Sequence, residues 1–258
     1  MKIKITACTV IFIIFFMPFA SEAAAKRDSF RTITDMTGRK VEIPVSLSRV
    51  ALFGGPTGQI AYILGARKQL CAVTVAIRGS DLILAFDPSI RELPAPRSTS
   101  GHVNIEELLA ANPQLVIAGT FDGTIVEKKT NIPVAYTESN MDHGIDLLKR
   151  EIRFYADVFQ KQSRADKYID YLDKTISFIK SRTKDIPRSK RKVIFNGYGP
   201  NHLVTLGGDT FMHERIETAG CVDAASTINS TGIQEGLHSG LIEISMEKVL
   251  GWNPDILV

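Results

Sequence analysis

Two stretches of the chain, far apart in the sequence, carry the same pattern. Residues 105–117 read IEELLAANPQLVI and residues 246–258 read MEKVLGWNPDILV. Each has a glutamate in second place, then an apolar pair, an Asn-Pro step and three residues typical of strands. Because the residue before a proline disfavours helix, each stretch predicts a short helix that ends at Asn-Pro and leads into a buried strand.

The segments upstream of these stretches also correspond. Residues 49–58 (RVALFGGPTG) and 192–201 (KVIFNGYGPN) each read as a strand that runs into a Gly-Pro loop. The chain is therefore an internal repeat of two units in which strands alternate with helices. Such units predict an α/β fold with two lobes, each built on a Rossmann-like parallel sheet. Ligands of these sheets bind beyond the carboxyl ends of the strands, so the predicted site lies between the lobes.

The stretch between the two units has a different character. It contains no proline and, after Gly144, no glycine up to residue 184, and its apolar residues recur every three or four positions. This pattern predicts one long helix that bridges the lobes, with roughly 40 residues and a length of about 60 Å. A helical hairpin that breaks near Gln162-Ser163 is the alternative.

The first 25 residues have the features of a secretory signal peptide. Lys2 and Lys4 precede an apolar run over residues 7–19, and small residues follow up to Ala25, where we expect cleavage, with Ala23 as the alternative. The expected organisation is a leader over 1–25, an N-terminal lobe over 26–140, a connecting helix over 141–186 and a C-terminal lobe over 187–258. We expect the mature protein in the periplasm.

Composition and motifs narrow the function. The chain is 44% hydrophobic and 23% charged with a net charge of +3, which indicates a globular protein and gives no reason to expect a nucleic-acid partner. It contains no GxSxG, GxGxxG, Walker, CxxC or HExxH motif, so an exported enzyme is the least favoured interpretation. Cys71 and Cys221 occupy corresponding places in the two units, which favours two separate buried thiols over a disulfide.

Together these features resemble a family of substrate-binding proteins of ABC importers, the type that carries ferric siderophores, haem or vitamin B12. The resemblance covers residues 30–258 and rests on the two Asn-Pro stretches, the connecting helix and the opening DMTGRKVEIP at 35–44. It implies a monomer without catalysis or cofactor that closes on a small-molecule ligand and docks on a membrane permease. In this family one glutamate on each lobe pairs with permease arginines, and the matching positions are Glu106 and Glu247. Alternatively, each glutamate only favours the dipole of its own helix.

The resemblance also implies that the second unit should continue beyond residue 258. By analogy with the first unit, a loop, a helix, a strand like that at 132–136 and a closing helix should follow. We therefore expect the C-terminal lobe to be truncated.

Candidate ligand contacts are sought in the loops that follow the predicted strands. Arg78 suits an anionic oxygen, Tyr198 suits a flat chelate or iron through its phenolate, and the backbone of the loop at 54–58 suits an anion. Each has a structural alternative as a solvated, packed or turn residue. The full candidate set is Gly55, Pro56, Thr57, Arg78, His102, Phe121, Asp122, Tyr198, Asn201 and His238. An iron chelate (siderophore or haem) or a corrinoid ranks first as ligand, and a bare metal ion or an oxyanion such as molybdate ranks second.

Overall fold

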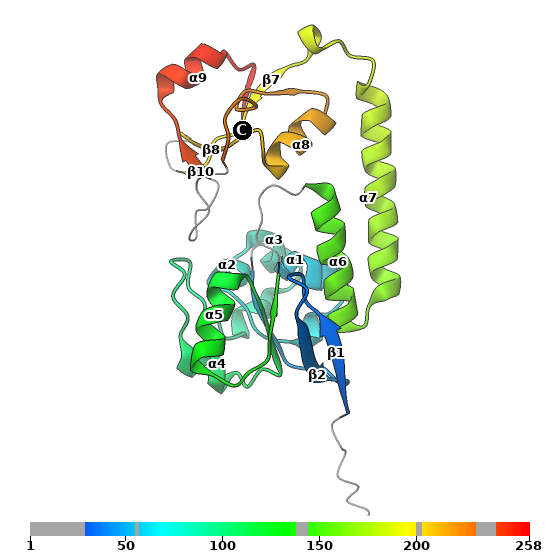
Figure 1. Cartoon of the computed structure of the whole chain (residues 1–258), viewed down its shortest axis with the longest axis vertical. Helices are drawn as coiled ribbons and strands as arrows, with labels where there is room; N and C mark the ends of the chain where they lie inside the picture. The colour runs from blue at the N-terminus through cyan, green and yellow to red at the C-terminus, as the bar shows by residue number, and fades with distance from the viewer. Residues whose placement is uncertain (1–28, 55–56, 138–143, 200–202, 231–240) are drawn as a thin grey trace, which may run out of the picture.

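The computed structural model describes residues 29–54, 57–137, 144–199, 203–230 and 241–258 (Figure 1). The expected leader over residues 1–25 lies outside these ranges. The described chain forms two α/β lobes that are joined by helices. Within the described ranges, no helix is both long and apolar enough to cross a membrane.

A hairpin precedes the N-terminal sheet and includes the opening stretch 35–44 on which the resemblance partly rests. β1 (Phe30–Thr34) pairs antiparallel with β2 (Lys40–Pro44). The turn between them is held by the buried Asp35, whose Oδ1 accepts the N–H groups of Thr37 and Arg39 at 3.0 and 2.9 Å. One carboxylate thus satisfies the backbone donors that the turn leaves unpaired.

The N-terminal lobe contains a four-stranded parallel sheet in the order β4-β3-β5-β6. Every residue of the central strands β3 and β5 is buried, as expected for a parallel sheet covered on both faces. The strands and their main helices are β3 (Val50–Phe53), β4 (Leu70–Ala72), β5 (Leu115–Ala118), β6 (Val134–Tyr136), α1 (Thr57–Ile63), α4 (Ile105–Ala110) and α5 (Thr120–Lys129). Shorter helices fill the connections: η1 (Arg67–Gln69), α2 (Val75–Arg78), α3 (Asp81–Phe86) and η2 (Pro88–Glu92).

The C-terminal lobe repeats the first three strands of this sheet. Its parallel strands have the order β9-β7-β11, so β7 takes the place of β3, β9 that of β4 and β11 that of β5. The internal repeat read from the sequence is thereby confirmed. The elements are η3 (Arg188–Lys190), β7 (Val193–Phe195), α8 (Phe211–Thr218), β9 (Val222–Asp223), α9 (Met246–Trp252), β11 (Ile256–Leu257) and the antiparallel pair β8 (Val204–Leu206) and β10 (Leu241–Glu243).

The two cysteines lie in equivalent places of the two lobes. Cys71 is in β4 and Cys221 directly precedes β9, and both are free thiols. The expectation of two separate thiols is confirmed, but only Cys71 is buried, whereas Cys221 is partly exposed.

The connection between the lobes is a helical hairpin, so the expected unbroken helix is wrong and the alternative is correct. α6 (Ile145–Phe159) ends at Gln160, which has a φ of +56°, and Lys161 N–H closes the turn on the carbonyl of Ala156 at 2.8 Å. This is a C-terminal cap of the Schellman kind with glutamine in place of the usual glycine. α7 (Gln162–Thr183) then runs back and bridges the two lobes (Figure 1).

The main core lies in the N-terminal lobe and includes α6. Side chains of this helix, among them Ile152, Tyr155 and Phe159, are buried together with residues of β3, β5 and α1. The boundaries at residues 140 and 186 stay a prediction. The C-terminal lobe has a smaller cluster around Phe195, Ala224 and Val249, with Trp252 packed against it.

Candidate functional site

The carboxyl ends of the strands of both lobes lie in the region between the lobes. In Figure 1, α1, α2 and α3, which follow β3 and β4, occupy the side of the N-terminal lobe that faces the C-terminal lobe. α8, β8 and β10 occupy the opposing side. Residues in these elements are therefore placed to meet a ligand from two directions.

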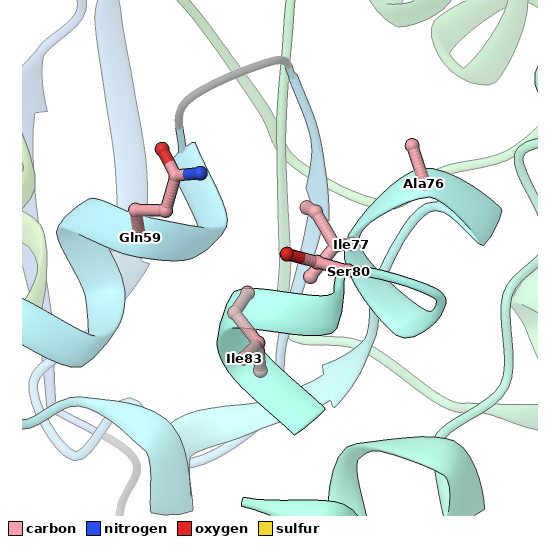
Figure 2. A pocket seen from close by; sticks show the side chains of 5 residues that line it. All are labelled: Gln59, Ala76, Ile77, Ser80 and Ile83. Carbon is pink, nitrogen blue, oxygen red and sulfur yellow. The ribbon is translucent and has the colours of Figure 1, made fainter. Parts of the chain in front are cut away.

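A hollow lies at this end of the N-terminal sheet and is lined by Gln59, Ala76, Ile77, Ser80 and Ile83. In Figure 2 the Gln59 amide and the Ser80 hydroxyl lie across the hollow from each other, with Ile83 below them and Ile77 beside Ser80. The hollow holds about 170 Å³, which is less than the roughly 300–1,000 Å³ typical of sites for drug-sized ligands and suits only a small one. Among the described residues that line it, two offer neutral hydrogen-bonding groups and none is a carboxylate.

Local sequence explains how the hollow forms. Thr74 caps α2 by accepting the N–H of Ile77 at 3.1 Å, which fixes the first turn of that helix beside α1. A Cβ at Gly58 would lie only 2.9 Å from the Ile77 side chain, so α1 approaches this closely because residue 58 is glycine. The hydroxyl of Ser80 precedes α3 without capping it, which leaves that hydroxyl available to a ligand.

Arg78 brings a positive charge to the same part of the lobe. It is the last residue of α2, between two residues that line the hollow, and is partly buried. It forms no ion pair with any of the described residues. Arg78 is not itself one of the residues that line the hollow, but an uncompensated guanidinium on a neighbouring position of the same helix can hold an anion.

On the C-terminal lobe, Tyr198 follows β7, as the sequence predicts, and is half-buried. Burial raises the pKa of its phenol, against the opposing effects of a hydrogen bond with Asn196 and of the Arg215 charge. Arg215 lies on α8 with its guanidinium 4.6 Å from the centre of the Phe211 ring. This lobe thus offers an aromatic hydroxyl close to a cation.

A histidine–aspartate pair on this lobe was missed by the sequence analysis. Nδ1 of His213 on α8 lies 3.1 Å from Oδ2 of Asp223, which ends β9 and is 3% exposed. The other carboxylate oxygen accepts the N–H of Ala225 at 2.9 Å. The pair orients the imidazole and leaves Nε2 for another partner. From sequence, His213 reads as an ordinary surface residue, because nothing local links α8 to the end of β9.

Two candidates on α5 have different surroundings. Phe121 is 60% exposed, whereas Asp122 is buried and accepts a hydrogen bond from Nε of Arg97 at 2.9 Å. Burial raises the pKa of Asp122, and the nearby guanidinium opposes that rise. Asp122 therefore holds Arg97 in place.

His102 is exposed and lies in a turn, in which its backbone N–H donates a hydrogen bond to Oγ of Ser98 at 3.0 Å. Ligand contacts by these residues stay a prediction.

Several candidates cannot be placed. Gly55, Pro56, Asn201 and His238 lie outside the described residues, as does the side chain of Thr57. Among the residues that are described, no three histidine, cysteine or acidic side chains gather as a metal site.

Glu106 and Glu247 occupy matching positions on the two lobes. Each is the second residue of its helix and is exposed, and each helix has a side-chain cap: Asn104 accepts the N–H of Glu107 at 3.1 Å, and Ser245 that of Lys248 at 3.3 Å. Hydrogen bonds from its own backbone N–H and from Ser245 lower the pKa of Glu247 and keep it charged. In Figure 1, α4 and α9 lie on the side of the molecule away from α7.

Comparison with known proteins identifies relatives over most of the chain. A family model described as periplasmic binding protein matches residues 49–258. The molybdate-binding protein MolA of Haemophilus influenzae is 27% identical over 253 residues, which span 88% of this chain and 68% of MolA.

Solved structures agree on the fold. The structure of H. influenzae MolA bound to molybdate superposes with a TM-score of 0.74 at 26% identity and covers 88% of this chain and 73% of MolA. A periplasmic solute-binding protein from Veillonella parvula gives 0.68 at 19% identity over 89% and 68% of the two chains. The haem-binding protein HmuT gives 0.63 at 19% identity over 89% and 71%.

Proposed function

Because the chain belongs to the periplasmic binding protein family and is similar to a transport protein that is not an enzyme, we propose that it captures a small oxyanion such as molybdate between its lobes. It then delivers this ligand to the permease of an ABC importer. The periplasm is its proposed location, reached through the leader at residues 1–25. This proposal places an oxyanion before the iron chelate that ranks first from sequence.

The observation that carries the proposal is the character of the hollow and its neighbour Arg78. Among the described residues, the lining of the hollow offers an amide and a hydroxyl and holds no carboxylate. Arg78, which pairs with no acid in the described ranges, ends the helix α2 that contributes Ala76 and Ile77 to the lining. Such a set matches a compact anion, which needs several donors and is repelled by acidic groups. The likeness to a protein that binds molybdate supports the same choice.

An iron chelate or haem is the second candidate, favoured by Tyr198. A half-buried phenol at a strand end can stack on a planar ligand or bind iron. The likeness to a haem-binding protein concerns the fold and is compatible with this candidate.

Calorimetric titration of the exported protein with sodium molybdate, a ferric siderophore, haemin and cobalamin tests the proposal. We expect saturable binding of molybdate alone, and a loss of about tenfold or more in Arg78→Gln, because charge-assisted hydrogen bonds are worth about 1.5–3 kcal/mol. Arg91→Gln, at an exposed arginine of η2, is the matched control and should bind normally. Saturable binding of haemin or siderophore without molybdate would establish the second candidate instead.

A further inference from the structure

Positive charge is concentrated at the C-terminal end of α7 and in the turn after it. Residues 180–192 contain seven of the chain's 31 Lys and Arg residues and a single acid, Asp185. The net charge of the whole chain is only +3, so the remainder is acidic overall. The positive charge is therefore a local feature of the surface.

Only part of this charge is neutralised by neighbouring acids. Arg188 and Arg191 share Glu217, at 3.6 and 3.3 Å, and Lys192 pairs with Asp255 at 2.8 Å. The other cations are exposed and form no ion pair with any residue in the described ranges: Lys180, Arg182, Lys184 and Lys190.

Large apolar side chains are exposed in the same region. Phe178 is 65% exposed and Ile186 is 37% exposed. Phe178 and Arg182 are four residues apart on α7 and are therefore neighbours on the helix surface. Cations around exposed apolar groups are the combination by which peripheral proteins bind anionic bilayers, with the apolar groups in the interface and the cations at the headgroups.

We propose that Phe178, Lys180, Arg182, Lys184, Ile186 and Lys190 form a docking surface for an anionic phospholipid bilayer. This lipid surface lies at the end of α7, and α7 lies on the opposite side of the C-terminal lobe from α9 (Figure 1). The residues proposed to dock on lipid therefore lie on a different side of the molecule from Glu106 and Glu247, which are the expected contacts of the permease. The lipid-bound protein is held near the membrane in an orientation other than the one that delivers ligand.

Co-sedimentation of the exported protein with vesicles tests this, after N-terminal sequencing has confirmed that the leader is absent. We expect binding to mixed phosphatidylglycerol–phosphatidylcholine vesicles, no binding to phosphatidylcholine alone, and a decline with added salt. Replacing Lys180, Lys184 and Lys190 together by Gln should weaken binding by about tenfold or more, since each cation near such a surface strengthens it several-fold. Phe178→Ser should also weaken it.

The matched control replaces Lys68, Lys128 and Lys129 by Gln, which removes the same charge from exposed positions on the other lobe. This control should bind vesicles within about twofold of the unmodified protein, since cations beyond the Debye length of the lipid surface contribute little. An equal loss in the control would overturn the proposal, because net charge alone would then explain binding. So would equal binding to neutral vesicles, or binding to duplex DNA without binding to vesicles. Ligand affinity should be unchanged in every variant, which separates this inference from the proposed transport function.

Discussion

At the scale of single residues, Asp87 shows how one carboxylate can hold several elements together. It accepts hydrogen bonds from the Tyr62 hydroxyl on α1, from Nε of Arg67 at 2.6 Å, and from Ser89 in η2. Burial alone would raise the pKa of Asp87, but these hydrogen bonds and the Arg67 charge outweigh it and lower the pKa to about 2. The ionised form is therefore the one that the fold stabilises.

The first prediction concerns acid stability at Asp87. Because its pKa is lowered in the folded state, the stabilisation is present above the ordinary pKa of 3.8 and is lost as the pH falls through about 2. Asp87→Asn should lower the free energy of unfolding at pH 7 by about 1–2 kcal/mol, after allowance for partial exposure, and by much less near pH 2. Urea unfolding of the unmodified protein and of Asp87→Asn, at pH values from about 2 to 7, measures this difference in stability. A loss that does not depend on pH would contradict the argument.

The second prediction concerns Glu151, whose pKa is shifted in the opposite direction from that of Asp87. Burial raises the pKa of Glu151 on α6 to about 7, with no opposing contribution. The folded state then binds a proton that the unfolded state has released, so stability falls as the pH rises from 4.5 through about 7. Glu151→Gln should remove this fall and raise the free energy of unfolding at pH 8 by about 1–2 kcal/mol. Denaturation at pH 5 and pH 8 checks it, and an equal effect at both would refute it.

At this scale, the sequence identifies residues that directly follow strands, but it does not reveal side-chain contacts between residues of different elements. The rule that selected Arg78 also covers Gln59 and Ser80, which follow β3 and β4 and line the hollow. By contrast, His213 and Asp223 meet only because α8 packs beside β9. No spacing in the sequence encodes that contact, so this part of the candidate site needed the structure.

At the scale of elements, the break between α6 and α7 is the feature that the sequence conceals. Gln160 adopts a left-handed backbone, which the apolar periodicity on either side does not indicate. Its Nε2 also donates to the carbonyl of Val45 at 3.1 Å, which ties the turn to the N-terminal hairpin. Glycine or proline would have signalled this turn, but neither is present.

A third prediction tests that turn. Gln160→Val should lower the free energy of unfolding by about 1–2 kcal/mol, because a β-branched residue is strongly disfavoured at positive φ. Gln160→Gly should remain within about 0.5 kcal/mol of the unmodified protein, since relief of the left-handed strain offsets the lost hydrogen bond and the entropy of glycine. Thermal unfolding of both variants shows which of the two is the less stable. Equal stability of the two would mean that the chain can continue as one helix.

The start of α6 is capped from the other lobe. Oε2 of Glu214 on α8 accepts the N–H of Ile145 at 2.9 Å, and a Cβ at Gly144 would fall 1.3 Å from that oxygen. A carboxylate at a helix N-terminus satisfies a free N–H group and favours the dipole. The contact joins α8 of the C-terminal lobe directly to the start of α6.

A double-mutant cycle makes the fourth prediction. Gly144→Ala should lower the free energy of unfolding by about 1–2 kcal/mol in the unmodified protein, because it displaces the Glu214 carboxylate. In a Glu214→Ala background the same change should cost well under half as much, since the clash is gone. Additive losses would show that Gly144 is needed for its backbone and not for this contact.

At the scale of the whole molecule, the repeat carried most of the information about the fold. Matching strands in the two units led to two parallel sheets, and the three strands that correspond have the same order in both. The overall charge was less informative, since a net +3 conceals the cationic end of α7. A net charge does not say where on the chain the charges lie, whereas a repeat shows which segments of the chain correspond to each other.

The fifth prediction depends on the arrangement of the two lobes. Glu106 and Glu247 are exposed at matching helix starts, and α4 and α9 lie on one side of the molecule. If both meet permease cations, Glu106→Ala and Glu247→Ala should each reduce ligand uptake several-fold in cells, and the double variant should reduce it by the product of the two effects. Glu92→Ala, at an exposed glutamate of η2, should leave uptake unchanged. The affinity for ligand in solution should stay constant, because neither side chain lines the hollow. A loss confined to one lobe would mean that only that lobe docks through its glutamate, and a parallel loss of affinity would assign both residues to ligand binding.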